Sequence, residues 1–157
     1  MKNKALIGTL AVLALLVVGV LFVSQKQEVS PASEDKVVKI GILQFVTHDA
    51  LDEIERGIED GLAEARYEGS NVELTVLNAE ADQSKIQTMS KKLVDDGNDV
   101  VIGIATPAAQ GLASATSDIP VIMGAISDPV GAKLVKNLDK PEGNVTGLSN
   151  HVPHAQT

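Results

Sequence analysis

The hydrophobic pattern of residues 37–149 alternates between two periodicities. Short apolar runs rich in β-branched residues occur at residues 37–46, 71–79, 99–106, 119–127 and 143–149. Runs of this kind are typical of strands that are buried on both faces of a parallel sheet. Segments between them repeat apolar residues every three or four positions, which predicts amphipathic helices.

Two of the predicted helices have a well-marked apolar side. In the first helix, acidic residues occupy the opposite side, and the apolar positions are Leu51, Ile54, Ile58, Leu62 and Ala65. The second helix is expected to begin with Asp82 as its cap and to end at Gly97. Its buried stripe comprises Ile86, Met89, Leu93 and Val94. A third helix is expected after Pro107, in the segment AAQGLASAT.

Alternating strands and helices are the signature of a doubly wound parallel sheet, so the sequence predicts an α/β domain over residues 37–150. In such sheets ligands bind beyond the carboxyl ends of the strands, near the point where strand order reverses. This rule selects three loops, at residues 44–49, 106–109 and 127–130.

The N-terminus carries the clearest targeting feature. Lys2 and Lys4 precede an uncharged apolar run at residues 5–23, which is about long enough to cross a bilayer as a single hydrophobic helix. Residues 1–24 are therefore expected to be an export signal, either a cleaved signal peptide or an uncleaved membrane anchor. Residues 25–36 are polar and contain Pro31, as in a flexible tether. The domain is expected to be extracytoplasmic, anchored to the cell membrane or secreted.

Charge and composition exclude several classes of protein. The formal net charge is -8 and the chain has no cysteine, so thiol chemistry, disulfides and lipidation of a cysteine are excluded. A nucleic-acid partner would require a cationic surface. Aromatic residues make up only 2% of the chain, which also argues against base stacking.

A search for catalytic patterns leads to a negative expectation. The acidic residues between Asp52 and Asp60 follow the exposed side of a helix, whereas carboxylate catalysis requires two acids in different environments. His48 is a single histidine, and His151 and His154 are separated by Pro153. Neither phosphate-binding glycine motif nor a GxSxG elbow is present. We therefore expect no enzymatic activity, no cofactor and no metal.

Polar groups in the three selected loops favour ligand binding instead. Thr106 begins a helix, so its hydroxyl and the nearby amides could bind a carboxylate or phosphate, or Thr106 could simply be the cap. Asp128 precedes Pro129, which favours a turn leading into a short helix, and it could also pair with a ligand ammonium group. A few polar groups around an apolar cleft, without a nucleophile, indicate a binding protein. The candidate ligand-binding residues are Gln44, Thr47, His48, Thr106, Pro107, Ala108, Ser127, Asp128 and Asn150.

Four segments resemble a known family. They are IGILQFVTHDALD, GLAEARYEGSNVEL, IATPAAQ and DIPVIMGAISDPVGAKLVKNLDKPEGNVTGLS. Together they resemble the extracytoplasmic substrate-binding proteins of ABC importers, of the tryptophan/tyrosine type, from about Val37 to the end. The resemblance implies a two-lobed periplasmic-binding-protein fold of type I that closes over an aromatic amino acid or similar small molecule, with ABC permease subunits as partners. An alternative with the same fold is a membrane-anchored extracytoplasmic ligand sensor.

The chain departs from the family pattern in three places. Asp49 follows His48 where the family usually has proline, which predicts an altered first loop. Arg66 precedes Tyr67 where glycine is usual, which predicts a different helix end. The family also has a second lobe of similar size. Residues 37–150 would be the N-terminal substrate-binding lobe, and residues 151–157 the start of a crossover to a second lobe that this chain does not contain.

Overall fold

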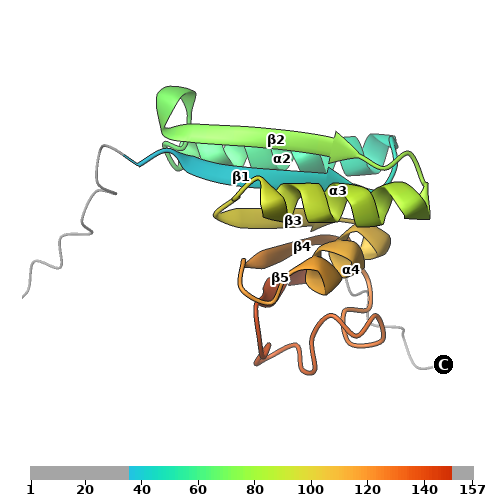
Figure 1. The fold of residues 1–157 in the computed structure, drawn as a ribbon. Helices are drawn as coiled ribbons and strands as arrows, with labels where there is room; N and C mark the ends of the chain where they lie inside the picture. The colour runs from blue at the N-terminus through green and yellow to red at the C-terminus, as the bar shows by residue number, and fades with distance from the viewer. Residues whose placement is uncertain (1–35, 150–157) are drawn as a thin grey trace, which may run out of the picture. The chain divides into compact units, whose positions relative to one another are not determined.

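The computed structural model describes residues 36–149, in which five parallel strands form one sheet. The strands are β1 (Val38–Gln44), β2 (Val72–Asn78), β3 (Val100–Ile104), β4 (Val121–Ile126) and β5 (Val145–Ser149). Their order across the sheet is β2-β1-β3-β4-β5, and their arrowheads point to the same edge (Figure 1). The predicted α/β doubly wound parallel sheet is confirmed.

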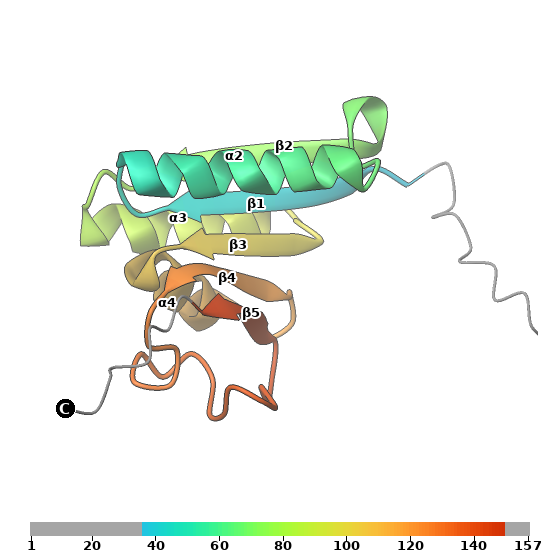
Figure 2. The ribbon, with the colours of Figure 1, turned by 180° about the vertical axis from the view of Figure 1, so that it is seen from behind.

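Helices cover both faces of this sheet. The helix α2 (Asp49–Glu64) lies on one face, and Figure 2 shows it in front of β1 and β2. On the other face lie α3 (Gln83–Asp95) and α4 (Thr106–Ala115), which pack against each other (Figure 1). A short 3-10 helix, η1 (Gly69–Asn71), precedes β2. In the described part of the chain, no helix is both long and apolar enough to span a bilayer.

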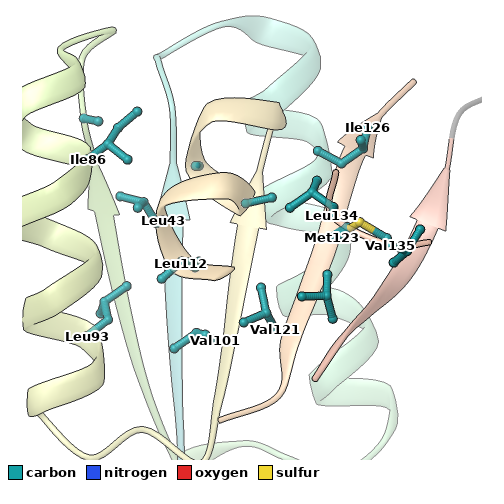
Figure 3. Packing of buried hydrophobic residues seen from close by; sticks show 14 residues of the cluster. Leu43, Ile86, Leu93, Val101, Leu112, Val121, Met123, Ile126, Leu134 and Val135 are labelled. Atoms are coloured by element: carbon teal, nitrogen blue, oxygen red, sulfur yellow. The ribbon is translucent and has the colours of Figure 1, made fainter. Parts of the chain in front are cut away.

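The alternation of side chains along the strands divides the core into two layers. The layer under α3 and α4 comprises residues from the sheet and both helices, among them Leu43, Ile86, Leu93, Val101, Leu112, Val121 and Met123 (Figure 3). The layer under α2 comprises Ile40, Ile42, Ile102 and Ile104 with Leu51, Ile54, Ile58 and Leu62. Since Ile42 and Leu43 enter opposite layers and both have 0% exposure, the prediction of a strand buried on both faces is confirmed.

Two glycines bring α4 very close to its neighbours. A Cβ atom added at Gly103 in β3 would lie 2.5 Å from the Cα of Ala109. One added at Gly111 would lie 2.3 Å from the Cγ2 of Ile86 in α3. The absence of side chains at these positions therefore fixes how α4 sits on the sheet, and with it the position of the α4 N-terminus.

Element ends differ from the predictions in three places. The strand predicted to reach residue 46 ends at Gln44, and Ala65 is the cap after α2 instead of part of its apolar side. The short helix predicted after Asp128 is wrong. Residues 128–134 form a hydrogen-bonded turn, in which the amide of Ala132 donates to the carbonyl of Asp128 at 2.9 Å. Lys133 has φ 59°, and this left-handed residue prevents a right-handed helix from continuing.

The end of α2 also corrects an expectation. Arg66 has φ 66°, and its amide donates to the carbonyl of Ala63 while that of Tyr67 donates to Leu62, at 2.9 and 2.8 Å. This pair of bonds is a Schellman motif, the common helix end that usually has glycine at its left-handed position. The different helix end predicted from Arg66 is therefore wrong, since arginine adopts the conformation that glycine would adopt.

Candidate functional site

The three loops selected from the sequence meet at the carboxyl edge of the sheet. Strand order reverses between β1 and β3, where Gln44 pairs in register with Ile104. Beyond the strands, the Phe45 amide donates to the carbonyl of Ile104 at 3.2 Å, and the Ala105 amide donates to that of Gly124 at 2.9 Å. The backbones after β1, β3 and β4 are thus tied together side by side.

Gln44 is the most buried polar residue of this edge, with 1% exposure. Its side-chain nitrogen donates to the carbonyl of Val46 at 3.0 Å and to Oδ1 of Asp52, in the first turn of α2, at 2.6 Å. Its side-chain oxygen is buried and has no hydrogen-bond partner. Gln44 therefore joins the first loop to α2 and leaves one strong acceptor unused.

The next two candidates, Thr47 and His48, are exposed and hold the first loop in place. His48 is the N-cap of α2, because its Nδ1 accepts from the Ala50 amide at 3.2 Å. An accepting Nδ1 requires the neutral tautomer with its proton on Nε2. The hydroxyl of Thr47 accepts from Nδ2 of Asn78 at 3.0 Å, which links the end of β1 to the end of β2.

A strained residue precedes the first turn of α4. Ala105 is the N-cap of this helix, with φ 74° and ψ 154°, a region that is almost restricted to glycine. Thr106 is the first helical residue, so the prediction that it could be the cap is wrong. Pro107 has no amide hydrogen, and the described residues provide no acceptor for the amides of Thr106 and Ala108. Both amides lie at the positive end of the helix dipole, but Ala108 is fully buried, whereas Thr106 is partly exposed, so Thr106 is the better placed of the two to bind an anion.

Asp128 has the predicted turn role. Its Oδ1 accepts from the Gly131 amide at 2.8 Å, and Pro129 beside it is fully buried. The side-chain nitrogen of Gln110 in α4 donates to the carbonyl of Ala132 at 2.9 Å, which fixes this turn against the helix. The exposed residue Ser127 accepts at its carbonyl from the hydroxyl of Ser149, at the end of β5, at 3.5 Å.

Two hollows are found away from the centre of this edge. One of about 400 Å³ lies near the amino ends of the strands and is lined by Lys39, Glu73, Thr75, Lys92, Asp96 and Asn98. The other, of about 330 Å³, lies beside β5 and reaches Pro129 and Ser149. Neither includes Gln44, His48 or Thr106.

Carboxylates near the site do not form a metal centre. Within residues 36–149, no group of three or more histidine or acidic side chains could hold an ion. Glu55 faces the same helix side as its acidic neighbours. Partial burial, together with the charges of Glu59 and Asp52, raises the pKa of its carboxyl group. One of these charges, that of Asp52, belongs to the carboxylate that binds Gln44.

Asn150 lies outside the described residues, as do residues 1–35 and 151–157, which include the predicted export signal, most of the tether and the crossover. Sequence reasoning missed two residues of the edge, Asp52 and Asn78. The position of Asp52, eight residues after Gln44 in the first helical turn, is a usable signal, but the helical pattern alone assigns this residue to the exposed acidic side.

Comparison with known proteins gives concordant results. A profile of the family described as ABC transporter substrate binding protein matches residues 39–157. The chain is 39% identical over 154 residues to a tyrosine-binding protein from Clostridioides difficile (strain R20291), covering 90% of this chain and 45% of that protein.

Solved structures are similar in fold and sequence. A crystal structure of an ABC domain in complex with L-Trp from Streptococcus pneumoniae is 64% identical, with a TM-score of 0.73 over 74% of this chain and 39% of that one. A ligand-free, open structure of a substrate-binding protein with adhesive properties from Clostridium difficile is 42% identical, with a TM-score of 0.72 over 74% of this chain and 40% of that one. The chain thus spans less than half the length of these relatives.

Proposed function

Because the chain belongs to the ABC transporter substrate-binding protein family, we propose that residues 37–150 are the N-terminal lobe of an extracytoplasmic solute-binding protein that binds an aromatic amino acid for an ABC importer. The observation that carries this proposal is the 64% identity to a domain in complex with L-Trp. A tyrosine-binding relative supports the same ligand class.

The edge of the sheet supplies groups that suit the polar end of an amino acid. The unpaired amide of the partly exposed residue Thr106, at the start of α4, is a donor for its carboxylate. Additional polar contacts would come from Gln44, Thr47, His48, Ser127 and Asp128, with Pro107 as an apolar contact and Asn150 as a further candidate.

The same groups favour a binding protein over an enzyme. Catalysis by a hydroxyl or carboxyl group requires a nucleophile within hydrogen-bond reach of a base. In the described part of the edge, the Nδ1 of His48 accepts from a helix amide, and Oδ1 of Asp128 accepts from its own turn. These two possible bases thus hold loops, and a third, Asp52, accepts from Gln44.

Half of the ligand contacts would come from a second lobe. Proteins that close two domains around a ligand divide the binding site between them, and this chain spans less than half of its relatives. If each lobe contributes a few kcal/mol, the dissociation constant for one lobe alone is above about 1 mM.

Localisation and partners are inferred from the N-terminal sequence and the family. Lys2, Lys4 and the apolar run at residues 5–23 support export and either anchoring or secretion. Family membership supports ABC permease subunits as partners. A ligand sensor with the same fold would share the binding step, but it would pass a signal to an output domain instead of delivering the ligand to a permease.

A titration of the 157-residue chain tests the proposal. We expect L-tryptophan and L-tyrosine to shift backbone amide resonances of the loops after β1, β3 and β4 at millimolar concentration, with no shifts around Lys39 and Asn98 at the opposite edge. L-Leucine is the control for a non-aromatic side chain. Shifts only at the opposite edge, or none with either aromatic ligand, would contradict the proposal.

A further inference from the structure

Resting on this proposed function, we propose that the carboxylate of Asp52 binds the ammonium group of the ligand directly, and that Gln44 holds this carboxylate in position. Asp52 lies in the first turn of α2, and Figure 2 shows this end of the helix near the arrowhead of β1. The side chain is half-buried, so part of it is accessible from the carboxyl edge of the sheet.

The two carboxylate oxygens of Asp52 have different surroundings. Oδ1 accepts from the side-chain nitrogen of Gln44 at 2.6 Å and from the His48 amide at 3.5 Å. Within residues 36–149, no hydrogen bond reaches Oδ2. The buried side-chain atoms without a partner in that range belong to Gln44 and Ser90, and Oδ2 is not among them. Oδ2 is therefore an accessible acceptor with no partner.

The charge of Asp52 is not balanced by a cation. In the described part of the chain no lysine, arginine or histidine forms an ion pair with it, and Arg56 in the same helix pairs with Glu53. Partial burial of a carboxylate costs free energy, and a cation beside it offsets this cost. The ammonium group of an amino acid has three donors and a positive charge, so it suits Oδ2.

Gln44 fixes the direction of this carboxylate. Its side-chain nitrogen also donates to the carbonyl of Val46 at 3.0 Å, and its side chain has only 1% exposure. A carboxylate with one oxygen held by a buried amide presents the other oxygen in a defined direction. Such an arrangement reduces the entropy that is lost when a ligand binds.

The other charged group of an amino acid has a donor close by. Gln44 pairs in register with Ile104, and Thr106 follows two residues later at the start of α4. Neighbouring strands lie about 5 Å apart, so the side chain held by Gln44 and the Thr106 amide belong to the same part of the edge. An amino acid has its ammonium and carboxylate groups on one carbon atom and requires this proximity. Asp52 would bind the first group, and Thr106 the second.

The test compares two ligands and three forms of the full 157-residue chain. The ligands are L-tryptophan and 3-(indol-3-yl)propionate, which lacks only the amino group. The forms are the unmodified chain, Asp52→Asn and the control Asp60→Asn, which removes the charge of an exposed carboxylate in the same helix. Asparagine keeps an oxygen that can accept from Gln44. Affinities come from amide resonance shifts measured against ligand concentration, and the dispersion of the spectrum reports folding.

We expect the unmodified chain to prefer L-tryptophan by about tenfold, as for a hydrogen bond between charged groups. Asp52→Asn should remove this preference through weaker binding of L-tryptophan, and it should not weaken binding of the amine-free ligand. Asp60→Asn should retain the preference. The helix dipole also favours a carboxylate in the first turn of α2. If Asp52 had this structural role alone, its replacement would affect both ligands equally.

An unchanged preference for L-tryptophan in folded Asp52→Asn, or an equal loss of both ligands, would overturn the inference and leave the proposed function intact. If Asp52→Asn does not fold, the side-chain amide resonances of Gln44 in the unmodified chain decide. L-Tryptophan should shift them through the shared carboxylate, and the amine-free ligand should not. Shifts with both ligands or with neither would overturn the inference. Binding of neither ligand by the folded unmodified chain would contradict the proposed function itself.

Discussion

At the residue scale, six non-glycine residues of the described part of the chain have positive φ angles: Arg66, Glu80, Ala81, Ala105, Ala125 and Lys133. Arg66 ends α2 with φ 66°, Ala105 precedes α4 with φ 74°, and Ala125 near the end of β4 has φ 59°. Each costs energy for a residue with a Cβ atom, of the order of 1–3 kcal/mol. Ala105 and Ala125 lie at the carboxyl edge, next to the loops that carry the candidate residues.

Another feature at the residue scale is Asp49, at the start of α2. It is the first residue of α2, directly after the cap His48. Proline is favoured at this position because its missing amide hydrogen would have no helical partner, and aspartate is favoured there by the helix dipole. Both residues therefore suit the start of this helix. The position of Asp49 in α2 gives no support to the prediction that it alters the first loop.

Replacing Arg66 by glycine tests the strain at the end of α2. Arg66→Gly should raise the free energy of unfolding by about 1 kcal/mol, because glycine adopts positive φ without a steric cost. The matched control is Arg56→Gly inside the same helix, which should lower it by about 1 kcal/mol. Urea denaturation measures both. A destabilised Arg66→Gly would show that the arginine side chain contributes more than its backbone costs.

At the element scale, the contact between α4 and β3 controls the candidate site, because it positions the first turn of α4. This contact depends on Gly103, whose neighbour across the interface is Ala109. A side chain at residue 103 would have to push the helix away from the sheet. The α4 N-terminus would then move relative to the loops after β1 and β4.

Gly103→Ala should lower the free energy of unfolding by about 1–3 kcal/mol through overpacking. The control is Gly57→Ala on the exposed side of α2, where an added Cβ meets no atom within 4 Å. This change should raise stability by about 0.5–1 kcal/mol, because alanine is the better helix former. Thermal denaturation of both variants checks the pair, and equal effects would contradict the close helix-sheet contact.

The sequence predicted the elements better than the connections between them. Hydrophobic periodicity located all five strands of residues 36–149 and the three main helices, and Asp82 is the cap of α3 as expected, because these features depend on local pattern. Residues 128–134 were wrongly predicted to be helical, since their turn depends on Lys133 in a left-handed conformation and on the distant side chain of Gln110.

The edge of the sheet at which the candidate residues lie was predicted from topology. The hydrogen-bond partners of these residues were not predicted. The switch-point rule placed Gln44, His48 and Thr106 at the correct edge without any knowledge of the structure. The bond from Gln44 to Asp52 joins a strand to a helix. Sequence alone does not determine such a contact, because it depends on the angle at which α2 crosses the sheet.

At the scale of the whole molecule, the central claim is that this lobe supplies half of a binding site for an aromatic amino acid. The described candidate residues lie at one edge of the sheet, where Thr47, His48, Ser127 and Asp128 are exposed. A ligand held only at this edge would remain partly in water. Closure by a second lobe would bury it and strengthen its polar contacts.

Calorimetry with L-tryptophan on two proteins tests this claim most directly. One is the 157-residue chain, and the other is a chimera in which residues 36–149 are joined to the second half of the Streptococcus pneumoniae relative. We predict a dissociation constant above about 1 mM for the chain and of about 1 μM or lower for the chimera. Micromolar binding by the chain alone, or no binding by a folded chimera, would contradict the account.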